Sequence, residues 1–137
     1  MEKLEARLTQ RNIKPTAVRL SVLDHLLNRK TAVSLSILEN NFEKADRVTL
    51  YRTLKTFEEK KLIHAIDDGT GALKYALCKE SCECSIDDLH VHFHCNKCKE
   101  TYCLEQSQIP NISIPPDFKL EEVNMVMKGV CASCHSS

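Results

Sequence analysis

The sequence lacks any long apolar stretch. It contains no run of about 18 apolar residues, the length that a membrane-spanning helix needs, so we expect no contact with a membrane. Residues 1–7 carry charges where a signal peptide requires an apolar core, which predicts a cytoplasmic protein. Internal repeats and low-complexity tracts are also missing. A chain of 137 residues is therefore expected to form one compact unit or two very small ones.

The chain also lacks net charge, because 19 lysines and arginines balance 19 aspartates and glutamates. These charges are unevenly distributed: residues 1–75 hold 14 basic and 10 acidic side chains, and residues 76–137 hold 5 and 9. A basic half favours an anionic partner, and an acidic, cysteine-rich half favours cations. The excess in each half is modest, so charge alone does not assign a function.

Catalytic zinc signatures are absent. The sequence has no His-Glu-x-x-His, no His-x-Glu followed by Pro-Cys-x-x-Cys, and no evident general base beside its candidate metal ligands. A small zinc hydrolase, in which three protein ligands and a water share the metal, remains an alternative. We nevertheless predict that the protein is not an enzyme.

Cysteine is abundant, with eight residues. In a cytoplasmic chain this number favours metal binding, whereas in a secreted chain it would favour disulfides. The spacing favours metal, because two Cys-x-x-Cys pairs can each direct two thiolates to one ion. The predicted structural Zn2+ site consists of Cys95, Cys98, Cys131 and Cys134.

Three alternating histidines precede the first Cys-x-x-Cys pair. Residues two apart in a strand share a face, so His90 and His92 could hold a second metal with ligands from elsewhere. An ordinary pair of strand histidines is the alternative. We expect the turn at Cys95 to bend the strand and to leave His94 on the surface.

Capping residues and apolar periodicity predict four helices in the first 60 residues. The helices are expected at residues 3–11, 17–28, 35–41 and from 47 to about 60, with Thr16, Ser34 and Asp46 as N-caps. Two β-prone runs, 62–66 and 72–77, flank a glycine-containing turn and predict a hairpin. Helices followed by such a hairpin are typical of a winged helix-turn-helix domain.

The rest of the chain predicts a smaller second domain. Short strands are expected at residues 90–95, 101–104 and 119–130, and three prolines within 109–117 exclude a regular helix there. The expected fold class is α+β, with an N-terminal winged helix-turn-helix DNA-binding domain at 1–77. A linker or hinge at 78–89 would lead to a small C-terminal α/β dimerisation and metal-binding domain at 90–137.

The helix that begins at Arg47 would be the recognition helix, which enters the major groove of DNA. Its polar face lies opposite the apolar residues Leu50, Leu54 and Phe57. Basic side chains contact phosphates, while threonine and tyrosine reach base edges or thymine methyl groups. An ordinary solvated helix face is the alternative. The predicted DNA-contacting residues are Lys14, Thr16, Arg19, Thr49, Tyr51, Arg52 and Lys55.

Three motifs in order resemble the ferric uptake regulator (Fur) superfamily. Residues 46–54 followed by 62–63 resemble its recognition helix, and residues 13–19 resemble its N-terminal signature. The two Cys-x-x-Cys pairs with His90 and His92 resemble its metal-binding dimerisation domain. The resemblance implies a homodimeric repressor that binds a pseudopalindromic double-stranded DNA operator when its regulatory site is loaded with metal.

Within that superfamily the chain is most similar to the zinc uptake regulator (Zur) branch. The resemblance implies a repressor of metal-uptake genes with a zinc-sensing site of His64, Cys78, His90 and His92, and Cys84 or Cys103 as alternative ligands. One thiolate among imidazoles favours Zn2+. With Fe2+ or Mn2+ there, the chain would instead be an iron-, manganese- or peroxide-responsive regulator. Residues 31–34 contain no histidine, which the iron and peroxide branches have there.

The implied regulatory site would join the wing to the second domain. Metal binding would then fix the angle between the domains, and in a dimer that angle sets the spacing of the two recognition helices on DNA. A redox-controlled repressor is a further alternative, since oxidation of zinc-binding thiolates releases the metal.

Overall fold

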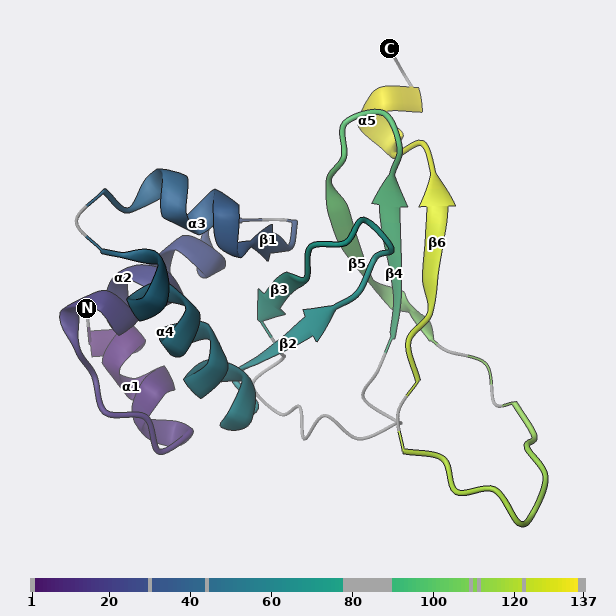
Figure 1. Cartoon of the computed structure of the whole chain (residues 1–137), viewed down its shortest axis with the longest axis horizontal. Coiled ribbons are helices and arrows are strands. Elements are labelled where there is room, and N and C mark those ends of the chain that lie inside the picture. The colour runs from purple at the N-terminus through teal and green to yellow at the C-terminus, as the bar shows by residue number, and fades with distance from the viewer. Residues whose placement is uncertain are drawn as a thin grey trace.

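Four helices form the N-terminal part of the molecule (Figure 1). The computed structural model describes residues 2–29, 31–43, 45–77, 90–108, 110, 112–121 and 123–135. The helices are α1 (Glu2–Gln10), α2 (Ala17–Leu27), α3 (Leu35–Asn41) and α4 (Arg47–Glu59). These bounds agree to within about one residue with the predicted helices, as is usual when strong caps define the ends.

Side-chain caps fix where α2, α3 and α4 begin. The hydroxyls of Thr16 and Ser34 accept hydrogen bonds from the amide three residues on, at 3.3 and 3.2 Å. The Asp46 carboxylate does the same at 2.8 Å. Each bond satisfies one of the amides that the first helical turn leaves without a partner. All three predicted caps are confirmed.

The inward face of α4 anchors the apolar core of the helical domain. Leu50, Leu54 and Phe57 have no exposed surface, because spacings of four and three residues place them on one side of the helix. Burial of one such side chain contributes about 1.5–3 kcal/mol. The opposite face of α4 is consequently held outward in a fixed orientation.

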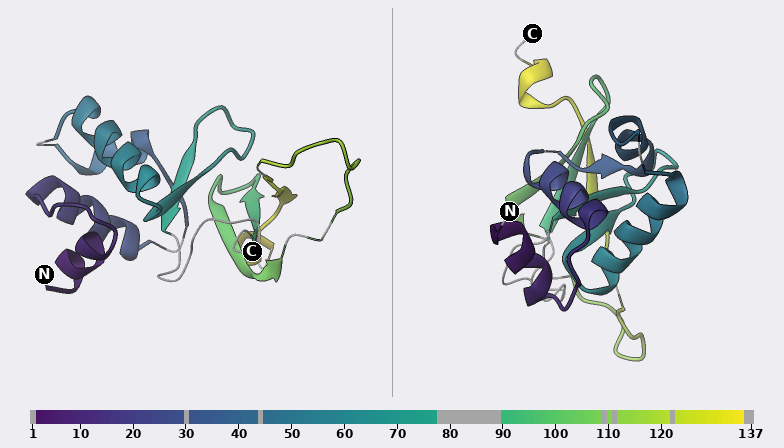
Figure 2. Two further views of the ribbon diagram at one scale, coloured as in Figure 1. Left: turned by 90° about the horizontal axis from the view of Figure 1, so that it is seen from below. Right: turned by 90° about the vertical axis from the view of Figure 1, so that its left-hand side faces the viewer.

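Three short strands form the wing, which lies between the helices and the C-terminal sheet (Figures 1 and 2). They are β1 (Val33–Ser34), β2 (Ile63–Ile66) and β3 (Lys74–Leu77), antiparallel and in the order β1-β3-β2. The predicted hairpin is confirmed as β2 and β3. Strand β1 was not predicted, because two residues are too few to show an alternating pattern.

The second sheet contains β4 (His90–Cys95), β5 (Thr101–Gln108) and β6 (Val126–Gly129) in the order β5-β4-β6, followed by the short helix α5 (Ala132–His135). Strand β4 runs antiparallel to β5 and parallel to β6. The predicted strand at 90–95 is confirmed, and β5 is longer than predicted. The prediction of a strand over 119–130 is wrong for most of its length, because the parallel ladder with β4 involves only Val126–Gly129.

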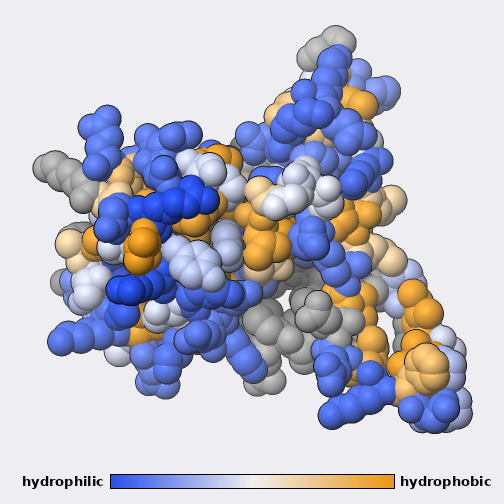
Figure 3. Space-filling view, in the orientation of Figure 1, coloured by the Kyte–Doolittle hydropathy of each residue, from blue (hydrophilic) through white to orange (hydrophobic). Residues whose placement is uncertain are grey.

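The proline-rich segment between β5 and β6 extends away from the sheet (Figure 1). Its described part, residues 112–121, contains no helix, as predicted. Apolar side chains are exposed along it, and the space-filling view shows this patch at the lower right (Figure 3). These exposed side chains are Ile112, Ile114, Phe118 and Leu120.

The mixed architecture of helices and sheets confirms the predicted α+β fold class. Helices α1 to α4 and the wing fall within residues 2–77, and the second sheet begins at His90. The predicted linker at 78–89 lies outside the described residues. Within the described part of the chain, no helix has both the length and the apolar character needed to span a bilayer.

Replacement of Leu54 by alanine should lower the free energy of unfolding by about 2–5 kcal/mol, because it leaves a cavity in a closely packed core. Urea denaturation of the full chain, followed by the helical circular dichroism signal, measures this loss. Val48→Ala on the same helix is the control, since Val48 is 54% exposed. It should change stability by less than about 0.5 kcal/mol. Equal losses in the two variants would contradict the assigned inward face of α4.

Candidate metal centres and nucleic-acid interface

Four cysteines converge at one end of the C-terminal sheet. Cys95 ends β4, Cys98 lies in the turn that follows, and the other pair flanks and enters α5. The four sulfur atoms all lie within 4.8 Å of one another. The structure therefore brings together the complete predicted set, which is Cys95, Cys98, Cys131 and Cys134.

Backbone amides prepare this cluster for a cation. The amides of Cys98 and Cys131 each donate to Cys95 Sγ at 3.4 Å. The Cys98 amide is the main cause that lowers the pKa of Cys95 to about 5, against the opposing effect of burial. The Tyr102 hydroxyl donates to Cys131 Sγ at 3.6 Å and lowers the pKa of that thiol. Two of the four sulfurs thus favour the thiolate form, which is the form that binds metal.

The geometry of the cysteine cluster fits a tetrahedral zinc ion. A Zn–S distance of about 2.3 Å implies sulfurs about 3.8 Å apart, and Cys98 Sγ lies 3.8 Å from Cys131 Sγ. Lys99 follows the first pair with a φ of 66°, and its amide donates to the Cys95 carbonyl at 2.9 Å. This tight turn directs both thiols of the first pair to the same side. The cluster has the closed, all-protein ligand set of a structural zinc site.

A second cluster lies between the wing and the C-terminal sheet. It contains His64 of β2, His92 of β4 and Cys103 of β5, with one ligand atom of each within 4.8 Å of the others. The Nε2 atoms of the two histidines are 3.3 Å apart. His92 and Cys103 are direct partners in the β4–β5 ladder, so their side chains project from the same face.

The structure places only part of the predicted regulatory set in this cluster. His64 and His92 were both predicted, and Cys103 was the alternative ligand. His90 belongs to β4, but its side chain lies outside the described residues, as do Cys78, Cys82 and Cys84. From the sequence, Cys103 was only a further thiol close after the first Cys-x-x-Cys pair. Its pairing with His92 in the β4–β5 ladder is what brings it into the cluster.

The expectation that His94 lies on the surface is wrong. His94 is 4% exposed, because β4 stays regular up to Cys95 and keeps His94 on the same face as His92. Its Nδ1 atom lies 3.0 Å from the Thr101 hydroxyl and 3.5 Å from Asp68 Oδ2. Both imidazoles therefore face the wing, and they meet different groups there.

Further contacts hold the two domains together. The Ala32 amide donates to the Thr101 carbonyl at 2.8 Å, and Asn124 Nδ2 donates to the Asp67 carbonyl at 2.9 Å. Arg29 pairs with Glu100 at 3.2 Å. A cation bound by the second cluster would therefore lie within a formed interface rather than between separate bodies.

The predicted DNA-contacting residues occupy the outward face of α4 and the start of α2. Thr49, Tyr51 and Arg52 are exposed, opposite the buried face of the same helix. Lys55 is half-buried, with its ammonium 5.8 Å from the centre of the Tyr51 ring and 3.4 Å from Glu58. This face presents cations and aromatic edges of the kind that contact nucleic acid.

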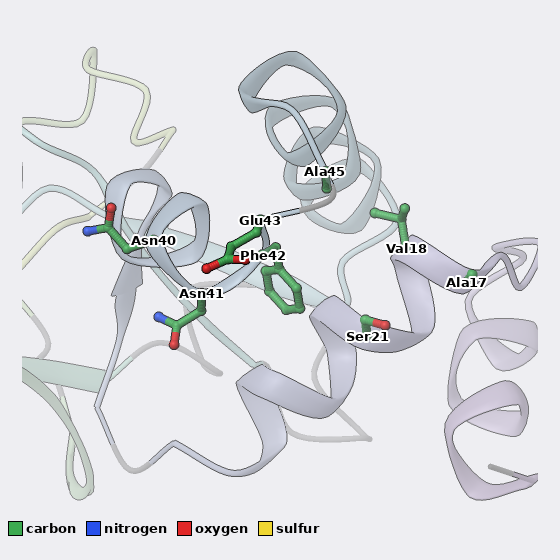
Figure 4. A pocket seen from close by; sticks show the side chains of 8 residues that line it. All are labelled: Ala17, Val18, Ser21, Asn40, Asn41, Phe42, Glu43 and Ala45. Atoms are coloured by element: carbon green, nitrogen blue, oxygen red, sulfur yellow. The ribbon is translucent and has the colours of Figure 1, made fainter.

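At the start of α2, Lys14 and Thr16 are exposed. Arg19 Nη1 donates to the Lys14 carbonyl at 2.8 Å, which ties the arginine to the preceding loop. An open hollow of about 610 Å³ lies between this end of α2 and the connection from α3 to α4 (Figure 4). Ala17 and Val18 border it on one side and Ala45 on the other. Ala17 directly follows the Thr16 cap of α2 and Ala45 directly precedes the Asp46 cap of α4, so the hollow lies beside the N-terminal ends of these two helices.

Comparison with known proteins identifies relatives for most of the chain. The sequence model described as "Ferric uptake regulator family" matches residues 10–128. The ferric uptake regulation protein of Bacillus subtilis is 29% identical over 91 residues, which cover 64% of this chain and 58% of that protein. The match thus spans less than two thirds of that relative.

Solved structures share the fold along almost the whole chain. A zinc uptake regulator complexed with zinc and DNA is similar with a TM-score of 0.69 at 22% identity, over 98% of this chain and 92% of that chain. The ferric uptake regulator of Helicobacter pylori is similar with a TM-score of 0.59 at 18% identity, over 99% and 91%. These similarities support the predicted architecture of a winged helix domain joined to a smaller sheet domain.

Cys95→Ser should unfold the C-terminal sheet, because structural zinc contributes folding energy, about 10–16 kcal/mol in zinc-finger peptides. His92→Ala should leave the melting temperature of the C-terminal half close to that of the parent while removing the second centre. Thermal melts and the zinc content of each purified variant measure both effects. Identical melts for the two variants would contradict the division into a structural and a separate second centre.

Proposed function

The chain belongs to the ferric uptake regulator family of metal-responsive DNA-binding regulators, and from this premise we propose that it is a zinc-sensing repressor of metal-uptake genes. Family members are transcriptional regulators rather than enzymes. The observation that carries the proposal is the cluster of His64, His92 and Cys103, which joins the wing to the C-terminal sheet. A ligand at that joint can couple metal binding to the orientation of the DNA-binding domain.

The two cysteine and histidine clusters have different tasks in this proposal. The four-cysteine cluster is closed, so its zinc stabilises the C-terminal domain and stays bound. The second cluster, which we call the sensing centre, draws its described ligands from both domains. Metal binding at this centre would therefore change the orientation of one domain relative to the other.

The donor set of the sensing centre favours zinc. Two imidazoles and one thiolate form a borderline-soft set, whereas Fe2+ and Mn2+ favour carboxylates together with imidazoles. A tetrahedral zinc ion needs a fourth ligand, and we propose that Cys78 or His90 supplies it. Relatives of the same fold include structures with manganese or iron, such as the ferric uptake regulator of Pseudomonas aeruginosa with manganese. The metal that the sensing centre of this chain binds is therefore tested directly below.

The proposed mechanism depends on the side chains that meet at the joint. His64 belongs to the wing and His92 to the second sheet, so their shared metal favours the closed arrangement of the domains. The metal shifts this equilibrium only by its higher affinity for the closed form. In a homodimer built on residues 90–137, closure would set the two copies of α4 about 34–36 Å apart, one turn of DNA. A pseudopalindromic operator matches that two-fold symmetry.

Operator binding should depend on zinc at the sensing centre. Protein that retains only its four-cysteine zinc should bind operator DNA weakly, and low concentrations of Zn2+ should restore tight, salt-sensitive binding. Fluorescence anisotropy titrations with Zn2+, Fe2+ and Mn2+ on the same preparation measure this response. A stronger response to Fe2+ or Mn2+ would overturn the zinc assignment, and equal binding with and without metal would overturn the sensing role.

Arg52→Ala should weaken operator binding by about 10- to 100-fold, because it removes an exposed cation from the proposed recognition face. If Arg52 contacts a phosphate, the slope of log K against log salt should also fall by about one. Lys119→Ala is the matched control, since it removes one exposed positive charge from the C-terminal domain. An equal loss in both variants would indicate a general charge effect instead of a specific contact.

A further inference from the structure

A buried carboxylate lies at the joint between the two domains. Asp68, in the turn between β2 and β3, is 1% exposed. Its Oδ2 atom accepts hydrogen bonds from Lys74 Nζ at 2.8 Å and from the Thr101 hydroxyl at 2.7 Å, and it lies 3.5 Å from His94 Nδ1. Its Oδ1 atom accepts from the Thr70 hydroxyl and amide. One wing residue thus contacts both β4 and β5 of the other domain.

These contacts keep the carboxylate charged. Burial alone would raise the pKa of Asp68, but the bonds from Lys74, Thr101 and Thr70 outweigh it and hold the pKa well below its ordinary value. A buried charge without partners is strongly destabilising. Withdrawal of the wing from the sheet would separate Asp68 from Thr101 and His94. These contacts, which we call the Asp68 network, therefore stabilise the closed arrangement, in which the wing lies against the C-terminal sheet.

The Asp68 network and the sensing centre take their residues from the same parts of the molecule, which are the β2–β3 hairpin, β4 and β5. Asp68 follows His64 in the same hairpin, and His94 follows His92 on the same face of β4. Thr101 precedes Cys103 on the same face of β5. The ladder pairs His94 with Thr101 and His92 with Cys103, with only the Phe93–Tyr102 pair between them, so the two sets are neighbouring pairs on one face of the sheet.

We propose that Asp68 is a positioning residue that holds the sensing centre assembled before metal arrives. This inference rests on the proposed sensing function of His64, His92 and Cys103. Because the wing is already held to the sheet, the ligands lose little freedom when they bind an ion, and preorganisation of this kind raises affinity. The described contacts of Asp68 are with Lys74, Thr101, Thr70 and His94 and not with these three ligands, so it acts through the position of the wing against the sheet.

The wing turn makes further contacts with the second domain. Besides Asp68, the turn contacts the second domain through the Asp67 carbonyl and Asn124. A side chain at Gly69, where φ is 83°, would meet Lys128 Nζ at 2.7 Å. The turn is therefore part of the joint between the domains, and loss of the Asp68 network should alter metal affinity rather than remove a DNA contact.

Asp68→Asn tests the proposal, since it keeps the shape but places an amide group where donors from three residues, Lys74, Thr101 and Thr70, converge. In full-length protein with the four-cysteine zinc retained, Zn2+ affinity is measured by competition with a chelator. Asp68→Asn should lower that affinity about tenfold, because the ligands then have to be ordered when the ion binds, and raise the zinc concentration for half-maximal operator binding by the same factor. Operator affinity at saturating zinc should stay within about twofold of the parent.

Two further variants keep the result interpretable. Asp67→Asn is the matched control, because Asp67 is the exposed neighbour whose carboxylate contacts only the Gly69 amide among the described bonds; it should retain parental zinc affinity. Thr101→Val removes the hydroxyl between Asp68 and His94 without changing size, and it should reproduce the loss if Asp68→Asn fails to fold. Small-angle scattering of protein that retains only the four-cysteine zinc should show a larger radius of gyration for both network variants than for the parent.

Parental zinc affinity and scattering in Asp68→Asn and Thr101→Val would overturn the proposal. The same result with Asp67→Asn as with Asp68→Asn would also overturn it, because the effect would then belong to the turn and not to the buried network. If the unmodified protein shows no zinc-dependent operator binding, the proposed function fails instead. Zinc affinity and scattering still decide the role of Asp68 in that case.

Discussion

The regularity of one strand determines how the two halves of this molecule meet. After a register shift between His90 and Val91, strand β4 keeps its two-residue alternation from Val91 to Cys95, so His92 and His94 both face the wing. His92 meets His64, and His94 meets Asp68 and Thr101. A bend before His94 would remove the one described group of β4 that contacts Asp68. The register of β4 is therefore a constraint on the metal centre and on the domain joint together.

Local chemistry explains what could be predicted from the sequence. The caps Thr16, Ser34 and Asp46 act within one helical turn, so their effect is visible in a short stretch of residues. The paired Cys-x-x-Cys spacing likewise limits each pair to one side of a tight turn. The helices of the DNA-binding domain and the composition of the four-cysteine cluster follow from such short-range rules.

Long-range pairing explains what could not be predicted. Cys103 joins His92 only through the β4–β5 ladder, and His64 reaches them only when the wing lies against the sheet. The burial of His94 depends on Asp68, which is distant in sequence and looks like an ordinary turn residue. The predicted strand over 119–130 failed for a related reason: β-prone residues form a strand only where a partner strand offers free hydrogen-bonding groups, and β4 offers them to only four residues.

In the proposed function, two kinds of interaction at one joint allow metal binding to act as a switch. If the domains moved freely, metal binding would have to supply the whole free energy of ordering them, and little would remain as affinity. The Asp68 network and the Arg29–Glu100 pair already favour the closed arrangement. Metal binding at the sensing centre then needs to contribute only the rest of the free-energy difference between the closed and open forms. In that proposal, residues that never contact the metal can tune the metal concentration at which the protein responds.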